Sequence, residues 1–398
     1  MGVASSLGVG AGQTLAALRE QRSGLDRCRF ETVDLDTWVG AVAGIDQAVI
    51  DDDLAAFDCR NNRLAQIALR SDGFDAAVAG ATARYGPSRI GVFVGTSTAG
   101  ILQTEIAYRL RTAGGQLPAG YDYAGTHNTF SVADFSRRLL GLAGPAVAVS
   151  AACASSAKVF GNAARMIRAG LIDAAVVGGV DSLCLTTLYG FDSLELVSNE
   201  PCRPFDARRR GISIGEAGGY ALLERLPAEP DPDATVFAGI GEASDAYHMS
   251  SPHPQGAGAR AAIEQALRSA DLQPAQIDYV NLHGTGTPSN DAAEDQAVFD
   301  VFGARVPASS TKGATGHALG AAGILEAIIC ALGIRHDLAP GGINTDLPDP
   351  VLRTRYLRTN LGMRIDRALS NSFGFGGANC ALVLARAASL PLAGNRVR

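Results

Sequence analysis

One thiol, one ammonium and two imidazoles stand in short motifs that are rich in glycine and small residues. Cys153 lies in Ala-Ala-Cys-Ala-Ser-Ser, and His283 begins His-Gly-Thr-Gly-Thr-Pro. Lys312 and His317 share Thr-Lys-Gly-Ala-Thr-Gly-His, and a fourth motif, Asn-Ser-Phe-Gly-Phe-Gly-Gly-Ala-Asn, spans residues 371–379. A thiolate can accept an acyl group, and neutral imidazoles can stabilise an enolate oxygen. The four motifs together predict chemistry on thioesters.

Cys153 has the sequence context of a nucleophile. It follows an apolar run that reads as a buried strand and precedes a stretch that reads as a helix. The N-terminus of a helix offers free N–H groups and a positive potential, so we expect a lowered thiol pKa. A buried structural cysteine is the usual alternative, and we assign that role to Cys184 and Cys330.

The two histidines are expected to converge on one spot, because both lie in strand-to-helix turns of the same half. His283 is followed by glycines that permit close approach of a ligand, and by Thr285 and Thr287. Their hydroxyls could bind an amide-containing arm such as pantetheine. His317 follows Lys312 by five residues, in a turn that leads into a helix.

Three carboxylates could pair with Lys312 and orient it: Asp291, Glu294 and Glu326. The alternative is that they are ordinary carboxylates on helix surfaces, and we expect this of at least one. Arginine takes the place of lysine almost everywhere in this chain, and Lys158 is the only lysine besides Lys312. A lysine kept inside a motif indicates a use for its compact ammonium.

Phe373 and Phe375 belong to the Gly-Phe-Gly-Gly turn of the fourth motif. They are ordinary core aromatics unless this turn lies beside Cys153. In that case its backbone N–H groups could complete an oxyanion hole, and one ring could act as a gate.

Composition excludes several classes of protein. The chain has 398 residues, 47% of them hydrophobic and 19% charged, which is typical of a globular protein of two domains or two halves. A net charge of −6 gives no support for binding nucleic acid. The seven cysteines are scattered, which argues against a zinc cage or a disulfide framework. We find no signal peptide and no apolar run long enough to span a membrane, and we expect a cytoplasmic protein.

Two arginine clusters stand out against the acidic balance: Arg208 to Arg210, and the pair Arg137 and Arg138. Each is expected to be a solvated face. The alternative is a docking patch for an acidic partner.

Short β-branched runs alternate with alanine-rich helical stretches, which indicates a layered α/β fold. We expect strands at residues 90–94, 146–149, 174–177, 219–224, 277–281 and 380–384. We expect helices at residues 11–21, 60–70, 155–169, 257–270, 291–302 and 319–334. The segment 227–233, rich in proline and acid, is a linker that divides the chain into halves 1–232 and 233–398. Each half carries a strand, a reactive loop of small residues and a helix in the same order, so we expect a topological repeat.

The motifs resemble those of the β-ketoacyl-acyl carrier protein synthases, of the elongating type with a Cys-His-His set. The resemblance covers nearly the whole chain and includes Arg203-Pro-Phe-Asp206 and the segment Gly316–Gly323. It implies the thiolase fold, with two pseudo-symmetric halves, mixed five-stranded sheets and a layered α-β-α-β-α arrangement. It also implies a homodimer, or a heterodimer with a related subunit, and residues 96–102 and 120–130 as pocket lining and dimer contact.

The resemblance assigns roles to individual residues. Cys153 would be the nucleophile, His283 and His317 the catalytic histidines, Lys312 the lysine and Glu326 its supporting glutamate. The backbone N–H groups of Cys153 and Phe375 would form the oxyanion hole. Substrates would arrive on the phosphopantetheine of acyl carrier protein, with no bound cofactor and no metal.

Some features depart from the family. The chain starts at Met1-Gly2-Val3, where the family has an apolar strand, so we expect the first sheet to lack its first strand. The segment Tyr247–Pro254 resembles synthases of aryl-polyene pigments more than those of fatty acids. Two other functions remain open: a non-elongating partner subunit like a chain-length factor, and a decarboxylase that does not condense.

Overall fold

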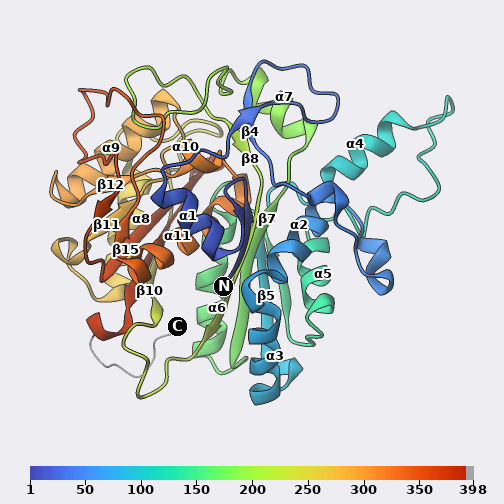
Figure 1. Cartoon of the computed structure of the whole chain (residues 1–398), viewed down its shortest axis with the longest axis horizontal. Coiled ribbons are helices and arrows are strands. Elements are labelled where there is room, and N and C mark those ends of the chain that lie inside the picture. Colours follow the sequence, from blue (N-terminus) through green and yellow to red (C-terminus); the bar gives the residue numbers. More distant parts are fainter. Residues whose placement is uncertain (391–398) are drawn as a thin grey trace.

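The computed structural model describes residues 1–390, which form two sheets on either side of a pair of buried helices (Figure 1). The first sheet has the strand order β2-β1-β9-β7-β5-β6. Its strands are β1 (Gly2–Ser5), β2 (Gly8–Val9), β5 (Ile90–Gly95), β6 (Ala146–Val149), β7 (Ala174–Asp181) and β9 (Ala217–Glu224). Every residue of β5 and β7 is buried, which accounts for their uninterrupted apolar sequences.

The second sheet has the order β10-β16-β15-β11-β12. Its strands are β10 (Thr235–Ser244), β11 (Tyr279–Asn281), β12 (Ala308–Ser309), β15 (Arg367–Gly374) and β16 (Ala378–Arg386). β15 and β16 are joined by the glycine turn of the fourth motif and run antiparallel along their whole length.

The two sheets repeat one topology. Leaving out the short β2, the strands of each half stand in the sheet in the order first, fifth, fourth, second, third along the chain. In each sheet the first two pairings are antiparallel and the last two are parallel. The expected topological repeat is confirmed, and the strands β6 and β12 that carry the reactive loops occupy equivalent places.

Two helices fill the space between the sheets: α6 (Ser155–Arg168) and α11 (Ala322–His336). They pack against each other and each contacts strands of both sheets. Every residue of Ala322–Ile334 is buried, and Glu326 is the only charged residue among them, which accounts for the apolar sequence on every face of α11. The expectation that no apolar run reaches the length of a membrane span is wrong, because Leu319–His336 is long and apolar enough by composition, yet 89% of it is buried inside the protein. It is a core helix.

Other helices cover the outer faces and complete the α-β-α-β-α layers (Figure 1). The first sheet is covered by α2 (Arg60–Leu69), α3 (Phe74–Tyr85) and α5 (Ser131–Leu139), and the second by α8 (Ala257–Ala270), with α9 (Pro288–Phe302) beside α8. The remaining helices are α1 (Ala11–Arg19), α4 (Ile101–Arg109), α7 (Leu185–Ser193) and α10 (Lys312–Thr315). Two small sheets consist of β3 (Asp26–Arg27), β4 (Trp38–Gly40) and β8 (Ile214–Gly215), and of β13 (Leu338–Ala339) and β14 (Leu361–Gly362).

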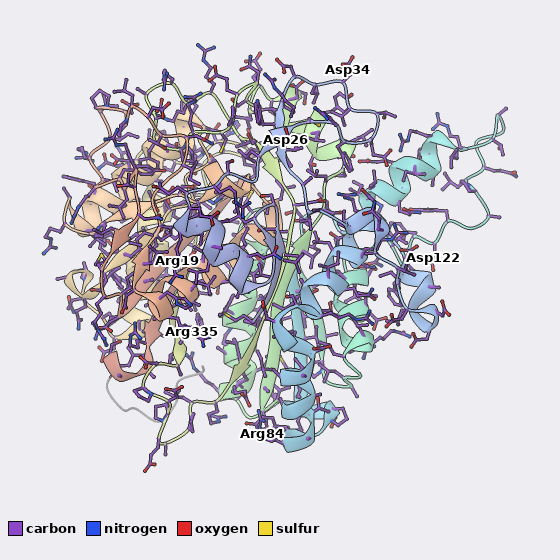
Figure 2. The ribbon with its side chains drawn as sticks, in the orientation of Figure 1. Arg19, Asp26, Asp34, Arg84, Asp122 and Arg335 are labelled. Carbon is purple, nitrogen blue, oxygen red and sulfur yellow. The ribbon has the colours of Figure 1, made fainter. Side chains whose placement is uncertain are left out.

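One arm projects from this body. The helix α4 and the chain after it extend away from the sheets in Figure 1, and Asp122 marks the returning part of the arm in Figure 2. The arm exposes large apolar side chains, among them Tyr108, Leu110 and Tyr123. A surface of this kind is typical of a contact with another chain.

Two expectations about the sheets are wrong in detail. The first sheet does not lack its first strand, because Gly2–Ser5 pair with Ala217–Tyr220 of β9. It has six strands rather than five, because the chain turns back after Ser5 and Gly8–Val9 pair with β1. The expected helices and strands are all present within a few residues. The longer elements that were not expected are β10, β15, α3, α4, α5 and α7.

Candidate active site

Cys153 lies at the turn between β6 and α6. The chain leaves β6 at Val149, passes Ala152 with a φ of 48° and enters α6 at Ser155. The Ser155 hydroxyl accepts a hydrogen bond from Ala151 N at 2.8 Å, which closes the turn. Cys153 is 6% exposed, as expected for a thiol that a substrate reaches through a narrow passage.

The structure brings the two histidines to this thiol. His317 Nε2 lies 3.1 Å from Cys153 Sγ. The rings of His283 and His317 are edge to face, with centroids 5.2 Å apart and an interplanar angle of 83°. The predicted convergence is therefore confirmed.

The loop of His283 is held by a buried carboxylate. Glu294, on α9, accepts hydrogen bonds from His283 N and Gly284 N, both at 2.7 Å, and from Asn371 Nδ2 at 3.0 Å. Glu294 does not pair with Lys312, contrary to one of the options from the sequence. It fixes the backbone that carries His283.

Lys312 is fully buried behind His283. Its Nζ donates to the carbonyl oxygen of His283 at 2.5 Å and to Glu326 Oε1, and it lies 3.4 Å from His283 Nδ1. Glu326 is thus the one of the three candidate carboxylates that orients Lys312. Because an ammonium faces Nδ1, a neutral His283 carries its proton on Nε2.

Asp291 serves a different part of the site. Its carboxylate accepts hydrogen bonds from Phe205 N at 2.8 Å and Gly286 N at 3.2 Å. Arg209 lies 3.7 Å from the same carboxylate and 2.6 Å from Asp349. The expectation that one of the three carboxylates lies on a helix surface is wrong, since all three are buried.

Burial sets the charge states of the site. It lowers the pKa of His283 and of His317 well below the usual value, and the ammonium of Lys312 lowers both further. Both imidazoles are neutral, as expected. Burial also raises the pKa of Cys153 to about 12, against a smaller lowering by Lys312. The expectation of a lowered thiol pKa is wrong, because desolvation of the thiolate outweighs the lowering by Lys312 and by the backbone hydrogen bond of Cys153.

The fourth motif lies beside Cys153. The ring of Phe373 is 5.9 Å from that of His283, and a Cβ added to Gly374 would come within 3.1 Å of Cys153 N. Phe375 is half-buried and its ring lies 5.5 Å from that of Phe191, on α7. The condition set for the two phenylalanines, that their turn lies beside the thiol, is met.

A cavity lies against the thiol. It has a volume of about 60 Å³ and is lined by Cys153, both histidines, Thr285, Thr287 and Ser250–Pro252. The two threonine hydroxyls are 3.0 Å apart. Thr287 also caps α9, because its hydroxyl accepts from Asn290 N.

Phe191 and the segment 250–252 were not among the candidates from the sequence. Phe191 stands in Tyr-Gly-Phe-Asp, which has no chemical signature, and only the fold places it opposite Phe375. The expectation of solvated arginine faces is wrong only for Arg209, which is half-buried and pairs with Asp349. Arg137 and Arg138 pair with Asp134, and their side chains keep 32% and 55% of their surface exposed.

The thiol and the two imidazoles also resemble a metal-binding set. Their ligand atoms lie within 4.8 Å of one another. A resident cation is disfavoured, because the Lys312 ammonium already faces the His283 ring. We keep the prediction that no metal takes part.

The fold and the site define a class. The profile of the beta-ketoacyl synthase N-terminal domain matches residues 1–229, and that of the C-terminal domain matches residues 234–346. The chain belongs to the β-ketoacyl synthase family, and it is an acyltransferase that forms carbon–carbon bonds.

Individual relatives refine this class. The 3-oxoacyl-acyl carrier protein synthase 2 of Coxiella burnetii is 36% identical over 313 residues, which are 75% of each chain. The mitochondrial 3-oxoacyl-acyl carrier protein synthase of Arabidopsis thaliana is 42% identical over 62% of this chain and 57% of its own length. Among solved structures, the complex of a ketosynthase (ApeO) with its chain length factor (ApeC) from Xenorhabdus doucetiae contains a chain that matches with a TM-score of 0.87 and 37% identity. That match covers 97% of this chain and 96% of the other.

Proposed function

We propose that the chain elongates acyl groups on acyl carrier protein by decarboxylative condensation with malonyl units, and that Cys153, His283, His317 and Lys312 perform the reaction. The observation that carries the proposal is the contact of 3.1 Å between Cys153 Sγ and His317 Nε2, with a second neutral imidazole beside it.

The first step loads the acyl group. Cys153 Sγ attacks the carrier-bound thioester, and the Sγ–C bond forms as the C–S bond to pantetheine breaks. The Cys153 proton passes to the departing pantetheine sulfur, while His317 keeps its proton on Nε2 and donates it to the Sγ that develops negative charge. Because burial holds the thiol neutral at rest, this proton must leave as the acyl group arrives.

The second step generates a carbanion. The malonyl carboxylate leaves as carbon dioxide, and its electron pair forms an enolate whose oxygen accepts hydrogen bonds from His283 Nε2 and His317 Nε2. In the acyl-enzyme the sulfur has no proton to share, so the neutral His317 donates from Nε2. Lys312, held by Glu326, keeps the proton of His283 on the side of the substrate.

The third step forms the product. The carbanion attacks the carbonyl carbon of the acyl-cysteine, the new C–C bond forms, and Cys153 leaves as a thiolate that recovers a proton from water. The backbone N–H groups of Cys153 and Phe375 stabilise the oxyanion in between. The closeness of Gly374 to Cys153 N supports this pairing.

Access to the thiol is controlled at the fourth motif. Phe375, paired with Phe191, acts as a gate, and Phe373 packs beside His283. Thr285 and Thr287, which line the cavity, bind the amides of pantetheine. Glu294 and Asp291 support the loop that carries His283.

We further propose that the chain works as a dimer, either with a second copy or with a related subunit. The apolar arm after α4 supports this proposal, as does the ketosynthase–chain length factor pairing of a structural relative. Acyl carrier protein delivers the substrates, and no bound cofactor is needed. The halves 1–232 and 233–398 act as the two domains, in the cytoplasm, where the free cysteines stay reduced.

The pathway is that of fatty acids, polyenes or polyketides, and the segment Tyr247–Pro254 favours an aryl-polyene product. A non-elongating partner subunit is disfavoured by the assembled Cys153–His317 pair, because such a subunit has no need of a nucleophile.

The test is condensation by purified protein with acyl- and malonyl-acyl carrier protein, for the native chain, Cys153→Ala and the buried control Cys330→Ala. We expect the β-ketoacyl product from the native chain and from the control, and none from Cys153→Ala. Normal condensation by Cys153→Ala would refute the assignment of the nucleophile. Native mass spectrometry of the same samples gives the number of subunits.

A further inference from the structure

A buried carboxylate that the reaction itself does not use lies at the end of β7. Asp181 is the last residue of this strand and is fully buried. Its Oδ1 accepts hydrogen bonds from the hydroxyls of Thr96 (2.7 Å) and Thr98 (3.0 Å) and from the backbone N–H groups of Ser97 and Thr98 (both 3.0 Å). Its Oδ2 accepts from Gly320 N at 2.7 Å and Ser97 N at 2.9 Å. Burial raises the pKa of Asp181, and the hydrogen bonds from Thr96, Ser97 and Thr98 lower it. Every one of these partners donates, which is the arrangement that favours the ionised carboxylate.

The partners of Asp181 belong to the loops that carry the catalytic pair. Gly320 lies three residues after His317, in the turn that leads to α11. Ser97, in the loop after β5, donates its hydroxyl to the carbonyl oxygen of Ala152 at 3.2 Å, next to Cys153. One side chain therefore joins the turn of His317 directly, and the turn of Cys153 through Ser97.

Each of these three turns contains a strained residue. Ala99, Ala152 and Leu319 have φ values of 47°, 48° and 49°, a backbone conformation that residues other than glycine rarely adopt. Such conformations persist only where the surroundings determine them, and they cluster at active sites. The hydrogen bonds of Asp181 hold the backbone of the Ala99 loop and of the Leu319 turn in these conformations. The packing is close as well, because a Cβ on Gly320 would lie 2.6 Å from Asp181 Oδ2.

We propose that Asp181 is a positioning residue, whose carboxylate holds the Cys153 turn and the His317 turn at the separation that the Sγ–Nε2 contact requires. This inference rests on the proposed condensation function, and it adds a residue that touches neither substrate nor reacting atoms. Asp181 also acts on the thiol through its charge, which raises the pKa of Cys153.

The test compares Asp181→Asn with the matched control Asp295→Asn. Asp295 is also buried, and it accepts backbone hydrogen bonds from Arg353 N at 2.9 Å and Thr354 N at 2.7 Å, in a segment that does not line the cavity. We expect Asp181→Asn to lower kcat of condensation by about 10- to 100-fold with KM for malonyl-acyl carrier protein nearly unchanged. The control loses stability but keeps kcat.

A second readout separates position from charge and needs no condensation. The rate of Cys153 alkylation by iodoacetamide, followed by intact mass, is measured against pH. We expect Asp181→Asn to shift this profile to lower pH, because a negative charge near the thiol is lost, and the control to leave it in place. Ser97→Ala keeps the charge but cuts the link to Ala152, so it should lower kcat without shifting the profile.

The outcomes are distinct. If Asp181→Asn keeps the native kcat and alkylation profile, the positioning role is wrong. If Asp181→Asn does not fold, Ser97→Ala decides, and native kcat in that variant overturns the proposal. If the native chain does not condense at all, the proposed function fails, whereas the alkylation profiles still test the influence of Asp181 on the thiol.

Discussion

Removal of the Lys312 ammonium separates stability from catalysis in this site. Lys312 is 1% exposed and Glu326 is 2% exposed, and each is the other's charge partner. Lys312→Met leaves the Glu326 carboxylate buried without its cation. The double variant Lys312→Met/Glu326→Leu removes both charges and fills the space with apolar atoms.

The magnitudes follow from the cost of an unpaired buried charge. Breaking a buried ion pair by removing one partner costs about 3–5 kcal/mol of unfolding free energy, whereas replacing both partners by apolar residues is close to neutral. We therefore expect Lys312→Met to lose about 3–5 kcal/mol of unfolding free energy and the double variant to recover most of it. Catalysis should not recover, because nothing then faces His283 Nδ1. The loss in decarboxylation rate is about 100- to 1000-fold in both variants.

Two assays measure the two effects. Urea unfolding of the native chain and of both variants, followed by circular dichroism, gives the stabilities. Carbon dioxide release from malonyl-acyl carrier protein gives the rates. A double variant that regains both stability and decarboxylation would refute the reasoning, since Lys312 would then serve only to neutralise Glu326. Unchanged stability of Lys312→Met would refute the assignment of a buried pair.

Three further predictions concern charge and access. The pKa of His283 in the folded protein lies well below 6.5, so the stability that the neutral ring contributes is present above pH 6.5 and is lost as the pH falls. The decarboxylation rate should therefore show no inflection near pH 6.5. An inflection there would contradict a neutral His283. The alkylation rate of Cys153 should keep rising above pH 9, in line with a pKa of about 12, and a plateau near pH 7 would show a preformed thiolate. The double variant Thr285→Val/Thr287→Val should raise KM for malonyl-acyl carrier protein by about 10-fold with little change in kcat, as measured by steady-state kinetics. An unchanged KM would show that these threonines do not bind pantetheine.

The sequence was most informative where chemistry is concentrated in short motifs. His283 and His317 stand in turns after strands of one sheet, and the carboxyl ends of parallel strands meet at one edge, so the convergence of the two imidazoles was predictable. Cys153 follows a strand of the other sheet, and its place beside them was implied by the family resemblance. The role of Glu326 was also within reach, because a helix of the same half carries it.

Other features depend on contacts between distant segments, which local patterns do not encode. Asp181 acts through Thr96, Thr98 and Gly320, and no motif links these positions. The raised pKa of Cys153 depends on burial of the thiol, which outweighs the lowering by Lys312. The strand Gly2–Ser5 was missed because small residues replace the usual β-branched ones, and its pairing with β9 determines it instead.

Intact-mass spectrometry of the protein with acyl-acyl carrier proteins, followed by addition of malonyl-acyl carrier protein, tests the central claim most directly. We predict an acyl adduct on Cys153 that disappears as a β-ketoacyl product two carbons longer forms on the carrier. Folded protein that takes no acyl group, or an adduct that persists after malonyl-acyl carrier protein is added, would contradict the assignment of this chain as an elongating synthase.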